Sequence, residues 1–309
     1  MSIKPSNRKG FHILLGSCAL FVVGYSLIQS QETAPSSVPY ASTASMSSTA
    51  PSTVPSASGK VIHLAMPQQT AQGFIEEARG YHTYCLHQVL DTDPEGKALL
   101  ELFNERVGYA LITGPKKLVV DQTEGNTKNV MIIVSSRRER AQNGFPIVGN
   151  WEYQDALRAI FAPLTTDYSV PWTGARLAHE LMHAQHYLAG TMPKHPTDEQ
   201  MLAEELRANR FELRLIDRTT KGEYLRQIDA WLASQTHVPD APKEWYRKPD
   251  EALYQSLQKL FPESLSVDEA ASRRGSLMAT LNIRLGEKKG LSDDTISHWM
   301  DTDLFHPHN

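Results

Sequence analysis

The chain has 309 residues, a formal net charge of −4 and a hydrophobic content of 40%, which is the composition of one large folded domain or two small ones. The mild acidity argues against a nucleic-acid partner, because nucleic-acid-binding proteins gather basic residues in a patch. The two cysteines, Cys18 and Cys85, are too few for a four-cysteine zinc site, so any bound metal is expected on His, Asp or Glu side chains.

The start of the chain has the order of a membrane-targeting segment. Residues 1–10 carry three basic side chains, and residues 11–28 are almost wholly apolar. This apolar run lies near the lower limit for a membrane-spanning helix, exceeds a typical signal-peptide core and lacks an obvious cleavage site, so we expect an anchor. The basic flank is expected in the cytoplasm, which places the rest of the chain on the periplasmic or extracytoplasmic side of the inner membrane of a cell envelope.

Two other interpretations of the apolar segment remain open. A cleaved signal peptide would give a secreted protein. The letters "LGSC", ending at Cys18, resemble a bacterial lipobox, which would lead to lipidation of this cysteine. Against lipidation, the apolar run continues for ten residues past Cys18, whereas a mature lipoprotein usually begins with polar residues.

A linker separates this segment from the folded part. Residues 29–59 are rich in Ser, Thr, Ala and Pro, with Glu32 as the one charged residue. Such a composition cannot bury enough apolar surface to offset the entropy of ordering, so we expect a disordered tether. Residues 60–309 then form the folded domain.

The first half of the folded part, residues 60–170, mixes helix and strand patterns. Residues 96–107 have the spacing of a helix, and so do residues 151–161, which follow a capping Asn150 and precede Pro163. The charged stretch 135–144 is expected to be a solvated loop. Three short apolar runs predict the strands of a small mixed or antiparallel sheet: 109–113, 117–120 and 130–135.

Helical patterns dominate the second half, residues 171–309. Besides the stretch 176–190, described next, four helical segments are expected: 197–217, 222–234, 249–260 and 266–286. A sheet with helices first and helices alone afterwards indicates the α+β class.

The stretch "RLAHELMHAQHYLAG", residues 176–190, contains an HExxH motif. Because positions i and i+4 of a helix share a face, His179 and His183 can direct two imidazole nitrogens at one ion. Glu180 points about 100° away and can reach a water on that ion. Three protein ligands leave zinc a fourth position for water, whose pKa falls towards neutrality, and Glu180 can take its proton as general base. The alternative is an amphipathic helix with partly buried histidines.

A third ligand is expected on the following helical segment, 198–217. On a helical wheel Glu205 lies near the centre of the apolar face and Glu204 at its edge, and a buried carboxylate needs a partner. Glycine and prolines within residues 190–196 allow an antiparallel return, which would place Glu205 opposite the histidine pair. Glu212 shares the central position but lies about two turns further on, too far to bind the same ion, so it can pair with an arginine or orient a histidine.

Glu205, in "EELRAN", follows the second histidine of "HELMH" by 22 positions. With this spacing, residues 176–217 resemble the gluzincin class of zinc metallopeptidases. The resemblance implies a zincin-like fold, one Zn²⁺ held by the motif histidines and Glu205, and a peptide or protein substrate. In that class Ala and Asp often stand three and four residues after the third ligand, and the Asp orients a ligand histidine. Ala208 fits, and Asn209 replaces the Asp, so its carbonyl is expected to take that role.

His186 lies on the same helix face as the motif pair. Three histidines at i, i+4 and i+7 extend over about 10 Å, too far to share one zinc ion comfortably, so His186 is expected to support a ligand, to contact substrate or to be a surface residue. The metzincin pattern fails, because it needs glycine and histidine where His186 and Ala189 stand. Zincin substrates commonly pair with an edge strand above the motif helix, and residues 130–135 are the candidate.

The expected protein is therefore a membrane-tethered zinc metallopeptidase. Its alternative is a zinc-binding, non-proteolytic interaction domain on the same tether. A purely structural helical domain without metal is the third hypothesis.

Overall fold

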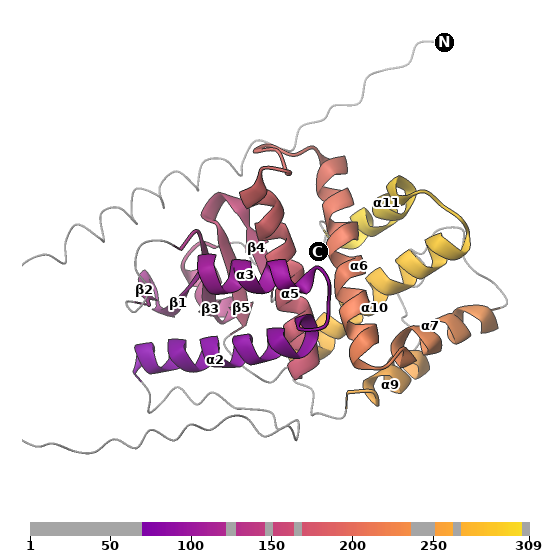
Figure 1. The fold of residues 1–309 in the computed structure, drawn as a ribbon, viewed down its shortest axis with the longest axis horizontal. Coiled ribbons are helices and arrows are strands. Elements are labelled where there is room, and N and C mark those ends of the chain that lie inside the picture. The colour runs from indigo at the N-terminus through magenta and orange to yellow at the C-terminus, as the bar shows by residue number, and fades with distance from the viewer. Residues whose placement is uncertain are drawn as a thin grey trace, which may run out of the picture. The chain divides into compact units, whose positions relative to one another are not determined.

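The computed structural model describes six stretches of the chain, which belong to one compact unit within residues 55–309: 70–121, 128–145, 151–163, 169–235, 251–261 and 267–304 (Figure 1). The predicted basic flank, apolar segment and tether all lie outside the described residues. Among the helices of these six stretches, none is both long and apolar enough to cross a membrane.

Helices and strands mix in the first part of the described chain, and helices alone follow. The helices of the first part are α2 (Ala71–Leu90), α3 (Gly96–Arg106) and α4 (Arg137–Gln142). The strands are β1 (Val107–Gly114), β2 (Lys117–Val120), β3 (Val130–Ser135), β4 (Glu152–Gln154) and β5 (Ala159–Pro163). The later helices are α5 (Val170–Ala189), α6 (Asp198–Thr219), α7 (Glu223–Ser234), α9 (Glu251–Gln258), α10 (Val267–Lys288) and α11 (Asp293–Leu304). This order confirms the α+β class.

The five strands form one mixed sheet in the order β2-β1-β3-β5-β4. Strands β1, β3 and β5 are parallel, and β2 and β4 run antiparallel at the two edges. The prediction that residues 130–135 form an edge strand is wrong, because β3 lies at the centre of the sheet. Its near-continuous apolar sequence is typical of a parallel strand buried on both faces. The edge strand that contacts α5 is β4.

Residues 151–161 do not form the predicted helix. They contain β4, a short 3-10 turn (Asp155–Leu157) and the start of β5. Ile160 and Phe161, which contributed to the helical spacing, are fully buried in the sheet, where they pair with β3. Arg158 takes a left-handed conformation with φ of 48° between the two strands. Strand pairing therefore overrides a local helical pattern. The predicted cap, Asn150, lies outside the described residues.

The charged stretch 135–144 contains a helix, α4, where a solvated loop was expected. Ser136 accepts a hydrogen bond from the backbone N–H of Glu139, and the Glu139 carboxylate accepts one from the backbone N–H of Ser136. This reciprocal capping box satisfies two donors that a helix N-terminus otherwise leaves free. Arg140 is buried, with its guanidinium 5.6 Å from the ring centre of Phe161, so this mostly exposed helix is fixed to the sheet by one side chain.

Helix α5 lies at the centre of the molecule's contacts. It packs against α2, α3 and α6 and also touches β4 (Figure 1). Cys85 of α2 is buried, as expected for an apolar residue. The motif helix is thus enclosed by α2, α3 and α6, and one side of it lies next to the short edge strand.

Candidate metal centre

The sequence of α5 determines both its ends and its burial. Pro171 lies in the first turn, where its missing N–H costs nothing, and Gly190 ends the helix in a left-handed conformation with φ of 70°. Almost every residue between Trp172 and Ala184 is buried, which is typical of a helix that crosses a core. Its polar residues therefore need specific partners, because a buried polar group without one is costly.

Helix α6 supplies these partners. It begins with a capping box in which Thr197 accepts from the N–H of Gln200 and the Gln200 side chain accepts from the N–H of Thr197. The helix then returns antiparallel to α5, so that higher residue numbers on α6 face lower numbers on α5: Glu212 faces His179, and Glu204 faces His183.

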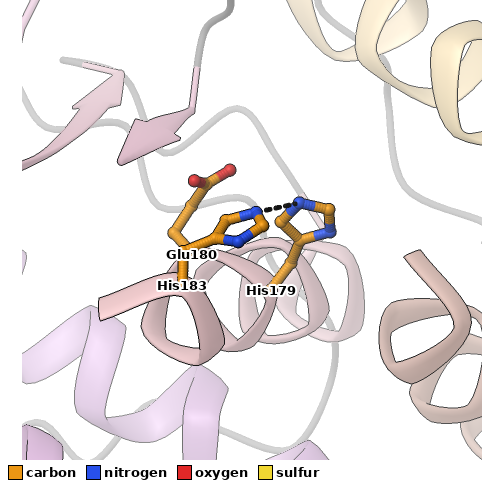
Figure 2. A group of neighbouring side chains, drawn as sticks. All are labelled: His179, Glu180 and His183. Carbon is orange, nitrogen blue, oxygen red and sulfur yellow. Dashed lines mark hydrogen bonds between the residues drawn. The ribbon is translucent and has the colours of Figure 1, made fainter. Parts of the chain in front are cut away.

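The two motif histidines and Glu205 converge on one point. The Nε2 atoms of His179 and His183 lie 3.1 Å apart (Figure 2). Glu205 has one carboxylate oxygen 3.6 Å from the Nε2 of His179 and the other 3.4 Å from the Nε2 of His183. Ligand bonds of about 2.0–2.1 Å in a tetrahedron give ligand–ligand distances of roughly 3.3–3.4 Å. The three separations are therefore close to the spacing between ligands of one tetrahedral ion, with the two Glu205 distances ending on different oxygens.

A proton or a cation has to lie between the facing ring nitrogens. At 3.1 Å two unprotonated Nε2 atoms would direct their lone pairs at each other, so a proton or a cation has to separate them. Both rings are almost fully buried, and water cannot easily take this place. The buried group of His179, Glu180 and His183 could hold a metal ion.

Glu180 is held by two donors on the side of the sheet. The backbone N–H of Tyr153 in β4 donates to one of its carboxylate oxygens at 2.7 Å, and the Arg176 guanidinium donates to the other at 3.2 Å. Figure 2 shows the carboxylate lifted away from the helix, beside the rings of His179 and His183. Glu180 thus belongs to the same buried group as the motif histidines, within 4.8 Å of them.

The Nδ1 atoms of the motif histidines face two further carboxylates of α6. His183 Nδ1 makes a hydrogen bond with Glu204 at 3.3 Å. His179 Nδ1 lies 3.0 Å from Glu212, at ion-pair distance but without the geometry of a hydrogen bond. Glu204 also accepts from His186 Nδ1 at 2.6 Å. Each motif ring therefore turns its Nδ1 towards a carboxylate and its Nε2 towards the convergence point.

The cluster carries more negative than positive charge. Four carboxylates surround the histidines, with one guanidinium among them: Glu180, Glu204, Glu205, Glu212 and Arg176. The Glu205 side chain is 28% exposed, whereas Glu204, expected at the edge of the apolar face, is 9% exposed. Partial burial raises the pKa of Glu205, but the positive charges of His183 and His179 outweigh burial and lower it to about 2. Burial and Arg176 lower the pKa of His179, whereas Glu205 and the other carboxylates raise it to about 9. The cluster therefore stabilises positive charge at its centre.

The structure does not bring Asn209 to a motif histidine. Its side-chain amide donates to the backbone carbonyl of Glu205 on its own helix at 2.8 Å. Glu212 holds His179 in its place, and it does so from the central position on the apolar face of α6 that the helical wheel already indicates. His186 is buried and paired with Glu204 rather than directed at the convergence point.

Comparison of the chain with protein-family models, with curated proteins and with solved structures finds no match. The resemblance to gluzincins therefore depends on residues 176–217 alone.

Proposed function

We propose that the chain is a zinc-dependent peptidase in which His179, His183 and Glu205 hold one zinc ion. The observation that carries the proposal is the triangle of these three side chains: the two Nε2 atoms lie 3.1 Å apart, and a different oxygen of Glu205 lies 3.6 or 3.4 Å from each. These spacings are close to those between the ligands of one zinc ion. The donor set of two imidazoles and one carboxylate is one that catalytic zinc sites use. The excess of carboxylates around the triangle also favours a divalent cation.

A bound zinc ion would supply a Lewis acid and would lower the pKa of a water in its open position. Glu180 stands beside the triangle and is our candidate for the base that takes the proton of the attacking water. Each of its oxygens accepts one hydrogen bond, from Tyr153 N–H or from Arg176, and keeps a second lone pair that can accept the proton. Because Glu180 is 3% exposed, bulk water does not compete for its carboxylate.

The short edge strand β4 offers a place for the substrate backbone. Its residue Tyr153 directs its N–H at Glu180 and away from the neighbouring strand β5. A peptide in an extended conformation could add to this edge through main-chain hydrogen bonds once the Tyr153 N–H is released from Glu180, which would lay it across the motif helix. The substrate class that we propose is therefore an extended peptide or an unstructured protein segment.

We further propose that residues 11–28 attach the enzyme to the inner membrane and that the peptidase domain lies on the periplasmic or extracytoplasmic side. The support is the order of basic flank, apolar run and polar linker in the sequence. Membrane fractionation of the full chain before and after an alkaline carbonate wash tests this part separately. Recovery of the chain in the soluble fraction would contradict it.

The second candidate is a zinc-binding domain without peptidase activity. One observation favours it: Tyr153 N–H and Arg176 each donate to one carboxylate oxygen of Glu180. These two hydrogen bonds restrict the rotation that would bring a free lone pair of the carboxylate to a bound water.

A digest of an unstructured peptide library separates the two candidates. We expect the wild-type chain with one equivalent of zinc to cleave peptides, a chelator to stop cleavage, and Glu180→Gln to keep the zinc while turnover falls by at least about a hundredfold. The matched control is Glu199→Gln, in the exposed first turn of α6, which should cleave like wild type. Zinc binding without cleavage by wild type would support the second candidate, and equal cleavage by wild type and Glu180→Gln would contradict the proposed base.

A further inference from the structure

Two carboxylates outside the HExxH motif, Glu204 and Glu212, each face the Nδ1 atom of one motif histidine. We propose that they are positioning residues, which fix the ring orientation and the tautomer of His183 and His179. This inference rests on the proposed function, because it assigns the ion to the Nε2 atoms. It goes beyond that function by giving both carboxylates, and not Asn209, the orienting role.

Glu212 is fixed from three sides. It accepts a hydrogen bond from Arg176 at 2.5 Å and lies 3.0 Å from His179 Nδ1, both on α5. Its other oxygen accepts from the hydroxyl of Ser276 on α10 at 2.8 Å. Its side chain is 2% exposed, so these contacts replace water and leave the carboxylate little freedom to rotate. The helix α10 thereby becomes part of the metal centre, although it contributes no ligand.

Glu204 joins His183 to His186. It lies 3.3 Å from His183 Nδ1 and accepts from His186 Nδ1 at 2.6 Å with the same oxygen. This gives His186 a function that its position on the helix face alone did not specify. It holds Glu204 in place, and through Glu204 it holds His183.

The chemistry requires such partners. A neutral imidazole carries one proton, and a carboxylate beside Nδ1 keeps the proton there, which leaves the Nε2 lone pair free for a metal. The negative charge also raises the basicity of the ligand nitrogen. Because both rings are held in this way, their Nε2 atoms lie 3.1 Å apart and face the carboxylate of Glu205.

Helix geometry explains why these two carboxylates reach the rings and Asn209 does not. Glu212 follows Glu205 by two helical turns and so lies on the same face of α6. Glu204 is adjacent to Glu205 in sequence and reaches the second ring from the edge of that face. Asn209 uses its side-chain amide to bond the carbonyl of Glu205 within the helix. The antiparallel return of α6 thus supplies all three carboxylates to α5.

Zinc affinity tests the inference directly. We expect Glu212→Gln and Glu204→Gln each to weaken zinc binding by about tenfold to a hundredfold in competition with a chromophoric chelator. Ser276→Ala and His186→Gln, which change only what holds each carboxylate, should weaken it less. Glu199→Gln is the control carboxylate on α6 and should bind zinc like wild type.

A second readout separates positioning from mere structural support. The visible spectrum of the cobalt-loaded chain reports ligand number and geometry, and we expect it to change in Glu212→Gln and Glu204→Gln but not in Glu199→Gln. Folding of every variant is checked by circular dichroism. If a Glu variant does not fold, Ser276→Ala and His186→Gln decide the question in its place.

Wild-type zinc affinity and an unchanged cobalt spectrum in the folded variants would overturn the inference while leaving the proposed function intact. Weaker zinc binding in the variants of a chain that cleaves no peptide would support the inference and contradict the peptidase. A wild-type chain that binds no zinc would overturn both.

Discussion

Gly174 of α5 touches the backbone of Cys85 in α2. A Cβ atom at residue 174 would lie 2.9 Å from the Cγ2 of Val89 and closer still to the carbonyl oxygen of Cys85. Real Cβ atoms do not approach other atoms so closely, so the two helices can take this distance only because residue 174 has no side chain. The contact lies little more than one helical turn before His179 and fixes the motif helix against α2.

Gly174→Ala should destabilise the fold. Alanine favours a helix over glycine by about 1 kcal/mol, but here the added methyl group meets backbone atoms that cannot rotate away, and we expect a net loss of about 1–3 kcal/mol. The matched control is Gly80→Ala in α2, where a Cβ would meet nothing within 4 Å. This substitution should stabilise the fold by up to about 1 kcal/mol. Urea unfolding of both variants is the measurement, and changes of the same sign would contradict the close contact.

Asp93→Asn should loosen the turn between α2 and α3. The Asp93 side chain is fully buried and accepts from the backbone N–H of Glu95 at 2.9 Å and from Arg214 and Arg218 of α6. Burial raises its pKa, but the Arg218 hydrogen bond, the Glu95 N–H and the charge of Arg214 outweigh burial and lower it. We expect a loss of about 1.5–3 kcal/mol at neutral pH, as for hydrogen bonds to a charged group.

The pH dependence and a surface variant test this assignment of Asp93. Because the folded pKa is depressed, the contribution of Asp93 is complete above its unfolded pKa of 3.8 and is lost as the pH falls through the folded value. Glu251→Gln removes a carboxylate that pairs with Arg274 at the surface, and it should cost clearly less stability than Asp93→Asn. Equal losses in the two variants, measured by urea unfolding, would argue against a special role for Asp93.

Local sequence signals predicted several helices. Residues 96–107 were expected as a helix from their apolar spacing, and α3 covers Gly96–Arg106. Gly190 was expected to break the motif helix and does end α5, but α5 already begins at Val170, before the expected stretch 176–190. Such signals act within one helical turn, so the sequence alone contains them. Helix α2 was not predicted, since Gly73 and Gly80 interrupt its helical pattern.

Features that depend on distant residues could not be predicted. The segment 151–161 forms strands because β5 pairs with β3, and no local pattern reports that pairing. The contacts of Glu212 join residues 36 and 64 positions away, Arg176 and Ser276. The helical wheel indicated that Glu212 is buried and able to orient a histidine. Only the fold shows that this histidine is His179 and that Glu212, rather than Asn209, lies beside it.

Glu205→Ala should abolish tight zinc binding, whereas Glu204→Ala should only weaken it. The carboxylate of Glu205 faces the Nε2 atoms, and that of Glu204 faces Nδ1. Loss of one of three ligands is expected to exceed the tenfold to about hundredfold loss that follows from removal of an orienting group. Equilibrium dialysis against zinc measures both variants. If Glu204→Ala loses more zinc than Glu205→Ala, the two neighbouring carboxylates have exchanged roles.

His82 should make the fold sensitive to mild acid. His82 belongs to α2 and is buried against β1 and the residue before β4. Its Nδ1 lies 3.0 Å from the Tyr109 hydroxyl, and its ring centre lies 5.5 Å from that of Trp151. Burial lowers its pKa from 6.5 to about 3, so the folded chain holds His82 neutral. Between these two pH values the unfolded chain binds one more proton at this residue than the folded chain does.

The stabilisation of the folded state that comes from neutral His82 should therefore be fully present above pH 6.5. Below this pH, the free energy of unfolding of wild type should fall by about 1.4 kcal/mol for each pH unit through His82. His82→Gln keeps a polar partner for Tyr109 but does not titrate, so its advantage over wild type should grow by that amount as the pH falls. The exposed His298 provides the control, and His298→Gln should retain the wild-type slope. Urea unfolding with chelator present, at about pH 7.5 and about pH 5, measures the three chains. A wild-type-to-His82→Gln difference that does not change with pH would mean that His82 is not held neutral by burial.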